Sequence, residues 1–220
     1  MRLSAIILLI LINVAQTFAQ DASAEREAYL KTITQRADKI VAALSIADAA
    51  QKEKVRDIIR DQYSNLNDIY TPRDLQVKTI KATNEDKALG DTAIAKVNRG
   101  VEAKLSKLHD KYIKKLNKHL PSAQVDMVKD GMTYGVLPIT YKGYQEQILT
   151  LTDEQKKQIL VWLTEAREKA MDAESSEKKH AWFGKYKGRI NNYLSAAGYD
   201  LKKEGQEWEK RRKAAQANKQ

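Results

Sequence analysis

Hydrophobic residues recur every three or four positions along most of the chain, which is the spacing of amphipathic α-helices. The pattern is clearest over residues 29–44, 55–69, 94–116 and 152–166. "TPRD" at Thr71 to Asp74 predicts the end of the second helix, because proline cannot continue a helical hydrogen-bond ladder. Ser175 and Ser176 predict the start of a further helix that ends near Gly198, and Asp200 can cap a last one. We expect an all-α fold, a single bundle of about six helices.

One segment interrupts this pattern. "DGMTYGVLPITYKGYQEQI", from Asp130 to Ile148, is rich in Gly and Tyr and contains a Pro. Because Gly and Pro disfavour helix, we expect an irregular loop near 130–148, with a short extended pair at Val136 to Tyr141 as an alternative. A short helix at 122–129, capped by Gly131, precedes it.

The first residues, "MRLSAIILLILINVAQTFAQ", have a basic start, an apolar run and small residues before Gln20. This pattern predicts a secretory signal peptide over 1–19, cleaved after Ala19. We therefore expect an exported protein, periplasmic or extracellular, with a helical domain at 20–212 and a frayed basic tail at 213–220. The chain has no Cys, so we expect neither a lipoprotein nor disulfides. The sequence after the signal peptide contains no second apolar segment, so we expect no transmembrane helix.

The net charge of +10 favours an anionic partner. An exported protein rarely meets nucleic acid, so we expect none and consider acidic polysaccharide instead. A simpler interpretation is that the excess charge keeps a helical surface soluble.

Signals for chemistry are few. His109, His119 and His180 have no metal-ligand spacing, so we expect no metal, and the absence of phosphate-binding and nucleophile motifs predicts no cofactor. A polysaccharide-active enzyme stays an alternative, since His180, Arg189 and a carboxylate would suffice if they converged. A non-catalytic role is favoured.

"HAWFGKYKGRINNY", from His180 to Tyr193, holds the most unusual composition. On a helix its aromatic residues share one face and should be core, while Gly184, Gly188, Asn191 and Asn192 lie on the other. Two Gly inside a helix are costly, so we expect a backbone or a ligand to approach them closely. We also expect Tyr134, Tyr141 or Tyr144 to pack near this side.

Amides, cations and aromatic rings suit a ligand rich in hydroxyl groups, because they offer hydrogen bonds and stacking surfaces. The candidate ligand-binding residues are Tyr134, Tyr141, Tyr144, His180, Trp182, Lys185, Arg189, Asn191 and Asn192. The "LTDEQ" string at Leu151 to Gln155 also resembles a motif of small periplasmic helical chaperones. A capping box explains the same string, so a chaperone or interaction module is the alternative.

Four stretches carry a family resemblance: "DGMTYGV…TYKGY", "LTDEQK", "EAREKAMDAESSEKKHAWFGKYKGRINNYL" and "GYDLKKE". Through them the chain closely resembles a family of exported bacterial proteins of unknown function, described as sugar-binding and often encountered beside polysaccharide-degradation genes. The resemblance runs from about Glu25 to Arg212 and is most specific from Asp130 to Leu201. It implies a secreted helical protein associated with carbohydrate, and it supplies no catalytic residues.

Overall fold

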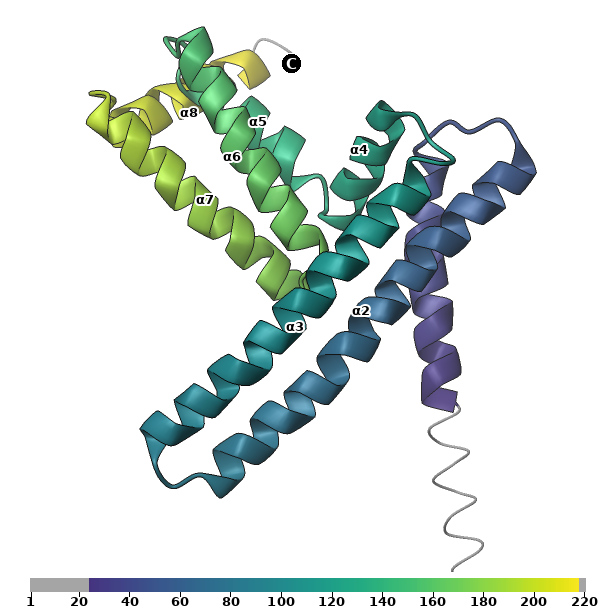
Figure 1. Ribbon diagram of the computed structural model, residues 1–220. Helices are drawn as coiled ribbons and strands as arrows, with labels where there is room; N and C mark the ends of the chain where they lie inside the picture. The colour runs from purple at the N-terminus through teal and green to yellow at the C-terminus, as the bar shows by residue number, and fades with distance from the viewer. Residues whose placement is uncertain (1–23, 218–220) are drawn as a thin grey trace, which may run out of the picture. The chain divides into compact units, whose positions relative to one another are not determined.

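The computed structural model describes residues 24–217, which contain eight helices. They are a helix over 24–42, α2 (Ala49–Thr83), α3 (Lys87–Leu116), α4 (Ser122–Met132), α5 (Val136–Gln147), α6 (Asp153–Met171), α7 (Ser176–Ala196) and α8 (Leu201–Ala217) (Figure 1). The all-α prediction is confirmed, whereas the expected number of about six helices is wrong, partly because the segment at 130–148 also forms helix. The expected signal peptide at 1–19 lies outside the described residues. Within 24–217, no helix combines the length and the apolar character that crossing a membrane requires.

The chain forms two compact units, Met1–Asn65 and Leu66–Gln220. In the first unit, the helix over 24–42 buries Ile33, Ala37, Ile40 and Val41 at helical spacing, as predicted. The Tyr29 hydroxyl donates to the carbonyl of Tyr63 on α2 at 3.0 Å.

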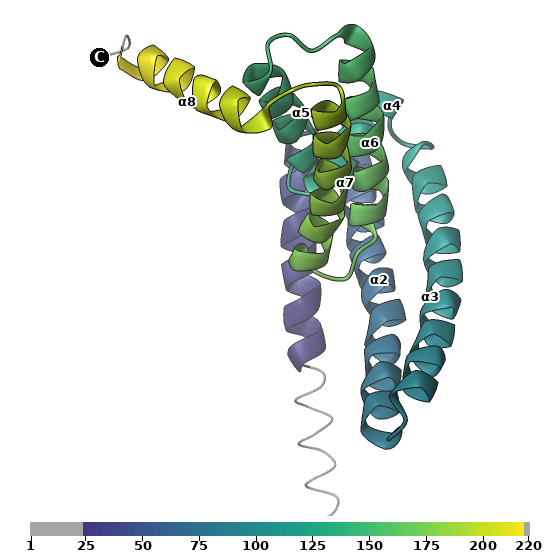
Figure 2. The same cartoon turned by 90° about the vertical axis from the view of Figure 1, so that its left-hand side faces the viewer.

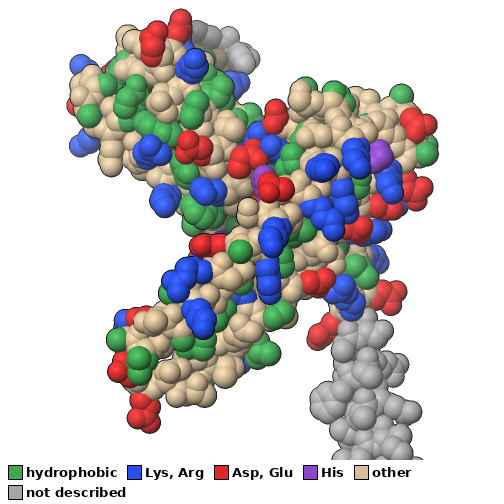
Figure 3. Space-filling view, in the orientation of Figure 1, with side chains coloured by type: hydrophobic (Ala, Val, Ile, Leu, Met, Phe, Trp, Pro, Cys, Tyr) green, Lys and Arg blue, Asp and Glu red, His purple; other side chains and the backbone are tan. Residues whose placement is uncertain are grey.

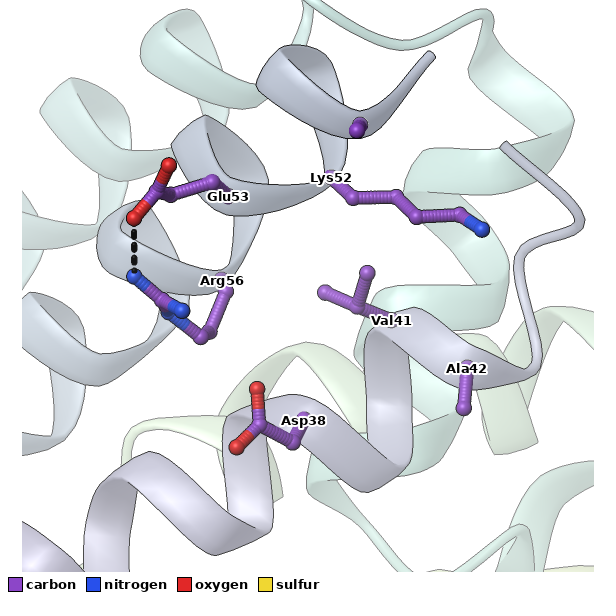
Figure 4. A pocket seen from close by; sticks show the side chains of 7 residues that line it. Asp38, Val41, Ala42, Lys52, Glu53 and Arg56 are labelled. Atoms are coloured by element: carbon purple, nitrogen blue, oxygen red, sulfur yellow. Dashed lines mark hydrogen bonds and ion pairs between the residues drawn. The ribbon is translucent and has the colours of Figure 1, made fainter. Parts of the chain in front are cut away.

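A hollow of about 460 Å³ lies in the first unit. Figure 4 shows Asp38, Val41 and Ala42 on one side, facing Lys52, Glu53 and Arg56 of α2. Glu53 and Arg56 form an ion pair at 3.0 Å on the same helix. Val41 and Ala42 are the end of the apolar face of the helix over 24–42, so this hollow reflects the packing of two helices.

The predicted helix end at "TPRD" is wrong, because α2 continues through Pro72 to Thr83. Proline leaves the carbonyl four residues earlier without its helical donor, which disfavours helix locally. Contacts with residues distant in the sequence hold the helix on both sides of Pro72. The Tyr70 hydroxyl donates to the carbonyl of Asp172 at 2.8 Å, and Arg73 pairs with Glu174 at 3.1 Å.

The irregular loop expected near 130–148 is also wrong, as is the extended alternative. This segment forms the end of α4 and all of α5, separated only by Thr133, Tyr134 and Gly135. Tyr134 and Gly135 both adopt positive φ, at 60° and 65°, and this left-handed pair turns the chain between the two helices. Pro138 lies in the first turn of α5, where its missing N–H has no helical partner to lose. Gly131 is inside α4 rather than its cap.

α5, α6 and α7 enclose the main core of the second unit. Its members include Ile148, Ile159, Leu163, Phe183 and Ile190, all essentially inaccessible to solvent. The two views agree that α6 and α7 lie side by side (Figures 1 and 2). They form a helical hairpin whose turn is short, so their directions are antiparallel.

Local sequence signals define the starts of these helices. Thr152 and Gln155 form the predicted capping box of α6, and the Ser175 side chain accepts from the N–H of Lys178 at the start of α7. The Asp200 side chain accepts from the N–H groups of Lys202 and Lys203, as expected for a cap of α8.

α8 lies across the end of α5. Arg211 donates to the carbonyls of Glu146 and Gln147 at 2.9 and 3.0 Å, so it satisfies free carbonyls of the last turn of α5. The helix continues to Ala217, and it therefore includes residues 213–217 of the expected tail.

Candidate functional site

A groove of about 720 Å³ lies in the second unit. Four helices line it: α2 with Tyr70, α3 with Glu102 and His109, α6 with Lys169, and α7 with Trp182; Asp172, which directly follows α6, lines it as well. It combines an aromatic wall with carboxylates, a histidine and an ammonium group. A concave surface with a few convergent polar groups is the usual form of a ligand site.

His109 joins α3 to α6 inside this groove. Its Nδ1 lies 2.6 Å from Oδ2 of Asp172, and its Nε2 lies 3.6 Å from Oε2 of Glu168. The hydrogen bond to Asp172 raises the pKa of His109 above its ordinary value of 6.5, although burial opposes this effect. Carboxylates that face both ring nitrogens stabilise the imidazolium relative to the neutral ring, and the imidazolium can donate a hydrogen bond from each nitrogen.

A network of ion pairs supports the floor of the groove beneath Glu168. Lys129 of α4 lies 2.9 Å from Glu168, and Arg167 of α6 contacts Asp126 at 2.6 Å and Asp130 at 3.0 Å. The Arg167 side chain is only 7% exposed. Burial raises the pKa of Asp130, and the guanidinium of Arg167 opposes that shift. This network fixes α4 against α6 and orients Glu168.

The turn between α6 and α7 is held from two sides. Tyr70 donates to the carbonyl of Asp172, and burial raises the pKa of this phenol, so it remains a neutral donor. Lys179 is buried and donates to the carbonyl of Met171 at 3.0 Å. An ammonium group at a helix C-terminus satisfies a free carbonyl and complements the helix dipole. The backbone that carries Asp172 is therefore well defined.

Trp182 is the one predicted binding residue that lines the groove, and it is half-buried. The ammonium groups of Lys169 and Lys185 lie 5.4 and 5.3 Å from the centre of its ring. Further along α7, Arg189 lies over Trp162 at 4.5 Å and 3.8 Å from Glu165. Trp182, Lys185 and Arg189 thus share one face of α7, beside residues of α6.

The other predicted residues lie elsewhere on α7 and its neighbours. Tyr134 stacks on His180 with ring centres 5.5 Å apart, and the Tyr144 hydroxyl donates to Oδ1 of Asn191 at 2.7 Å. Tyr141 is half-buried against the core, whereas Asn192 is exposed. The expected packing of the Gly/Tyr-rich segment against α7 is therefore confirmed. His180 and Arg189 are not among the residues that line this groove, and the enzyme alternative stays a prediction.

Tyr144 of α5 forms a hydrogen bond with Asn191 of α7. Its side chain is buried, and burial raises its pKa to about 12, so the hydroxyl stays protonated and donates to Asn191. A hydrogen bond donated by a buried hydroxyl stabilises the packing of α5 on α7.

The expected close approach of a neighbouring backbone to Gly184 and Gly188 is wrong, and the approach of a ligand stays a prediction. A Cβ atom added at either position would meet nothing within 4 Å. Both glycines lie on the exposed side of α7, so no neighbouring backbone offsets their conformational cost.

We therefore predict that Gly184→Ala and Gly188→Ala each raise the free energy of unfolding by about 1 kcal/mol, because Ala is the better helix former. Urea unfolding monitored by circular dichroism measures this. Gly135→Ala is the control: its φ of 65° strains any residue with a Cβ, so we expect a loss of about 1 kcal/mol. A loss at Gly184 or Gly188 would show that the space beside α7 is occupied.

Sequence reasoning missed His109, Asp172 and Tyr70 as members of one site. His109 and Asp172 are 63 positions apart, and each lies in an ordinary charged helical stretch, so no local pattern joins them. Asp172 stands close to His180 in the sequence, yet it pairs with His109. Within residues 24–217, no three His, Cys, Asp or Glu side chains are grouped so that they could hold a metal ion.

Comparison with known families gives one decisive result. A family model described as a protein of unknown function (DUF3826) matches residues 30–214. The chain belongs to the DUF3826 family. No curated protein matches the chain. Membership of DUF3826 confirms the resemblance to a family of unknown function, whereas the sugar-binding description stays a prediction.

Proposed function

We propose that this DUF3826 protein binds carbohydrate in the groove between α3, α6 and α7. The observation that supports the proposal is the position of Trp182, a half-buried ring at a groove of about 720 Å³ that is also lined by polar side chains such as Glu102 and His109 and by apolar ones such as Leu105. Pyranose rings present an apolar face and a rim of hydroxyls, and an indole ring beside hydrogen-bonding side chains complements both.

The polar walls offer acceptors and donors at fixed places. Asp172 and Glu168 are oriented by His109 and Lys129, and carboxylate oxygens are the kind of acceptor that sugar hydroxyls need. Glu102 is exposed on α3 and supplies a further carboxylate. Ordered polar groups lose little conformational entropy when a ligand binds, which favours affinity.

A panel of neutral and acidic oligosaccharides, titrated calorimetrically, tests the proposal. We expect at least one to bind, and Trp182→Ala to weaken it about tenfold or more. Trp208→Ala is the matched control, because Trp208 of α8 is also half-buried beneath a cation, Arg212 at 5.1 Å, but is not part of the groove.

Glu102→Gln provides a second variant whose folding is not at risk, since the side chain is exposed. It should weaken the same ligand several-fold, because a neutral amide is a weaker acceptor than a carboxylate. Absence of binding by every glycan at about millimolar concentration, or equal binding by all variants, would contradict the proposal.

A further inference from the structure

A strip of aromatic and charged side chains continues from the groove along α6 and α7. We call it the aromatic–cationic strip, and its members are Trp162, Glu165 and Lys169 of α6 and Trp182, Lys185, Arg189 and Tyr193 of α7. On each helix the positions recur at intervals of three or four, so they share one face. Trp182 and Lys169 belong to both the strip and the groove.

The two helices present these side chains in register. Trp162 meets Tyr193 edge to face with ring centres 5.2 Å apart, Glu165 meets Arg189, and Lys169 meets Trp182. The space-filling view shows hydrophobic and basic side chains gathered over α6 and α7 (Figure 3). From Trp182 to Tyr193 the strip extends for about 16 Å, at about 1.5 Å of helix rise per residue.

The charges of the strip are unbalanced. Its members include three cations, Lys169, Lys185 and Arg189, but one carboxylate, Glu165, and the Arg189 side chain is 57% exposed. On the basic helix α8, by contrast, Lys210 and Lys213 pair with Glu207 and Glu209 at 2.7 and 2.8 Å. Exposed cation–π contacts are weak, so the strip cations can leave the rings for an anion.

We propose that the aromatic–cationic strip binds an anionic polysaccharide, one with carboxylates on its sugar rings, as the chain extends beyond the groove. The rings of Trp162 and Trp182 stack on pyranose faces, and Lys185 and Arg189 pair with the carboxylates. The inference rests on the proposed function, to which it adds the class of ligand. A nucleic acid could also use rings and cations, but the sequence predicts an exported protein, and sugar carboxylates therefore fit better.

The test compares polygalacturonate with its fully methyl-esterified form, which has the same backbone without the charge. We expect about tenfold tighter binding of polygalacturonate at low salt and loss of that difference at high salt, because salt screens exposed charges. Lys185→Gln with Arg189→Gln should lower affinity for polygalacturonate about tenfold and leave the methyl ester within about twofold.

The matched control is Lys202→Gln with Lys203→Gln, an equal loss of charge at exposed positions of α8, and it should change neither affinity. If both polymers bind equally and only Trp182→Ala weakens them, the groove binds sugar and the inference about the strip is wrong. If neither polymer nor any other glycan binds, the proposed function fails as well. If single-stranded DNA binds as tightly as polygalacturonate, with the same dependence on Lys185 and Arg189, the assignment to polysaccharide is overturned.

Discussion

Replacing Arg167 by Met is expected to lower the free energy of unfolding by about 3 kcal/mol. The Arg167 side chain is 7% exposed and contacts Asp126, Asp130 and Glu168, so its loss removes the cation between Asp126 and Asp130, whereas Glu168 keeps Lys129. Asp130 suffers most, because burial already raises its pKa and Arg167 is the cation that opposes this. Met keeps much of the side-chain volume, which separates the loss of charge from the loss of packing. Urea unfolding at neutral pH measures the effect.

Two further variants make this measurement specific. Arg212→Met removes an exposed cation from α8 and should cost less than about 1 kcal/mol. Adding Asp130→Asn to Arg167→Met should restore part of the lost stability, since the neutral amide costs less to bury than an unpaired carboxylate. A cost at Arg167 equal to that at Arg212 would show that the ion-pair network is not what holds α4 against α6.

Replacing His109 by Gln is expected to cost about 1–2 kcal/mol in acid solution and less in alkaline solution. The hydrogen bond to Asp172 raises the pKa of His109 in the folded protein above its ordinary value of 6.5. The group therefore binds its proton more tightly when folded. Its contribution to stability is complete below about pH 6 and is lost as the pH rises through the folded-state pKa.

The measurement is the free energy of unfolding of both proteins between about pH 5.5 and pH 9. The difference between them should shrink as the pH rises, and this comparison removes the titration of groups that both proteins share. Glu168, also facing the ring, should favour the charged form, whereas Lys129 opposes it. A difference that is constant with pH would mean that His109 acts only through packing.

Helix starts were predictable because their signals are local. The side chains of Thr152, Ser175 and Asp200 each accept hydrogen bonds from N–H groups two or three residues further along the chain, and the Gln155 side chain accepts in return from the N–H of Thr152. The apolar face of α7 was predictable for a similar reason. Phe183, Tyr186, Ile190 and Leu194 are buried, and the edge residues Trp182 and Tyr193 are half-buried.

The errors arose where tertiary contacts outweighed local propensity. Pro72 lies inside α2, where the flanking Tyr70 and Arg73 are held by contacts more than one hundred positions away in the sequence. The Gly/Tyr-rich segment forms helix because Leu137 and Tyr144 of α5 are buried in the core with α6 and α7. Burial of such side chains outweighs the small helix penalties of Gly143 and of a proline in the first turn.

The amino-acid pattern alone was therefore enough to establish the all-α class, most helix starts and the inner face of α7, since each depends on neighbours within one or two turns. Only the folded chain could bring His109 of α3 to Asp172 at the end of α6, or Lys129 of α4 to Glu168, because those pairs depend on how separate helices pack. The same packing separates the candidate residues of α7, placing Trp182 at the groove and Asn191 against Tyr144. Spacing along one helix determines which face a side chain occupies, whereas the opposing helix determines what that face can bind.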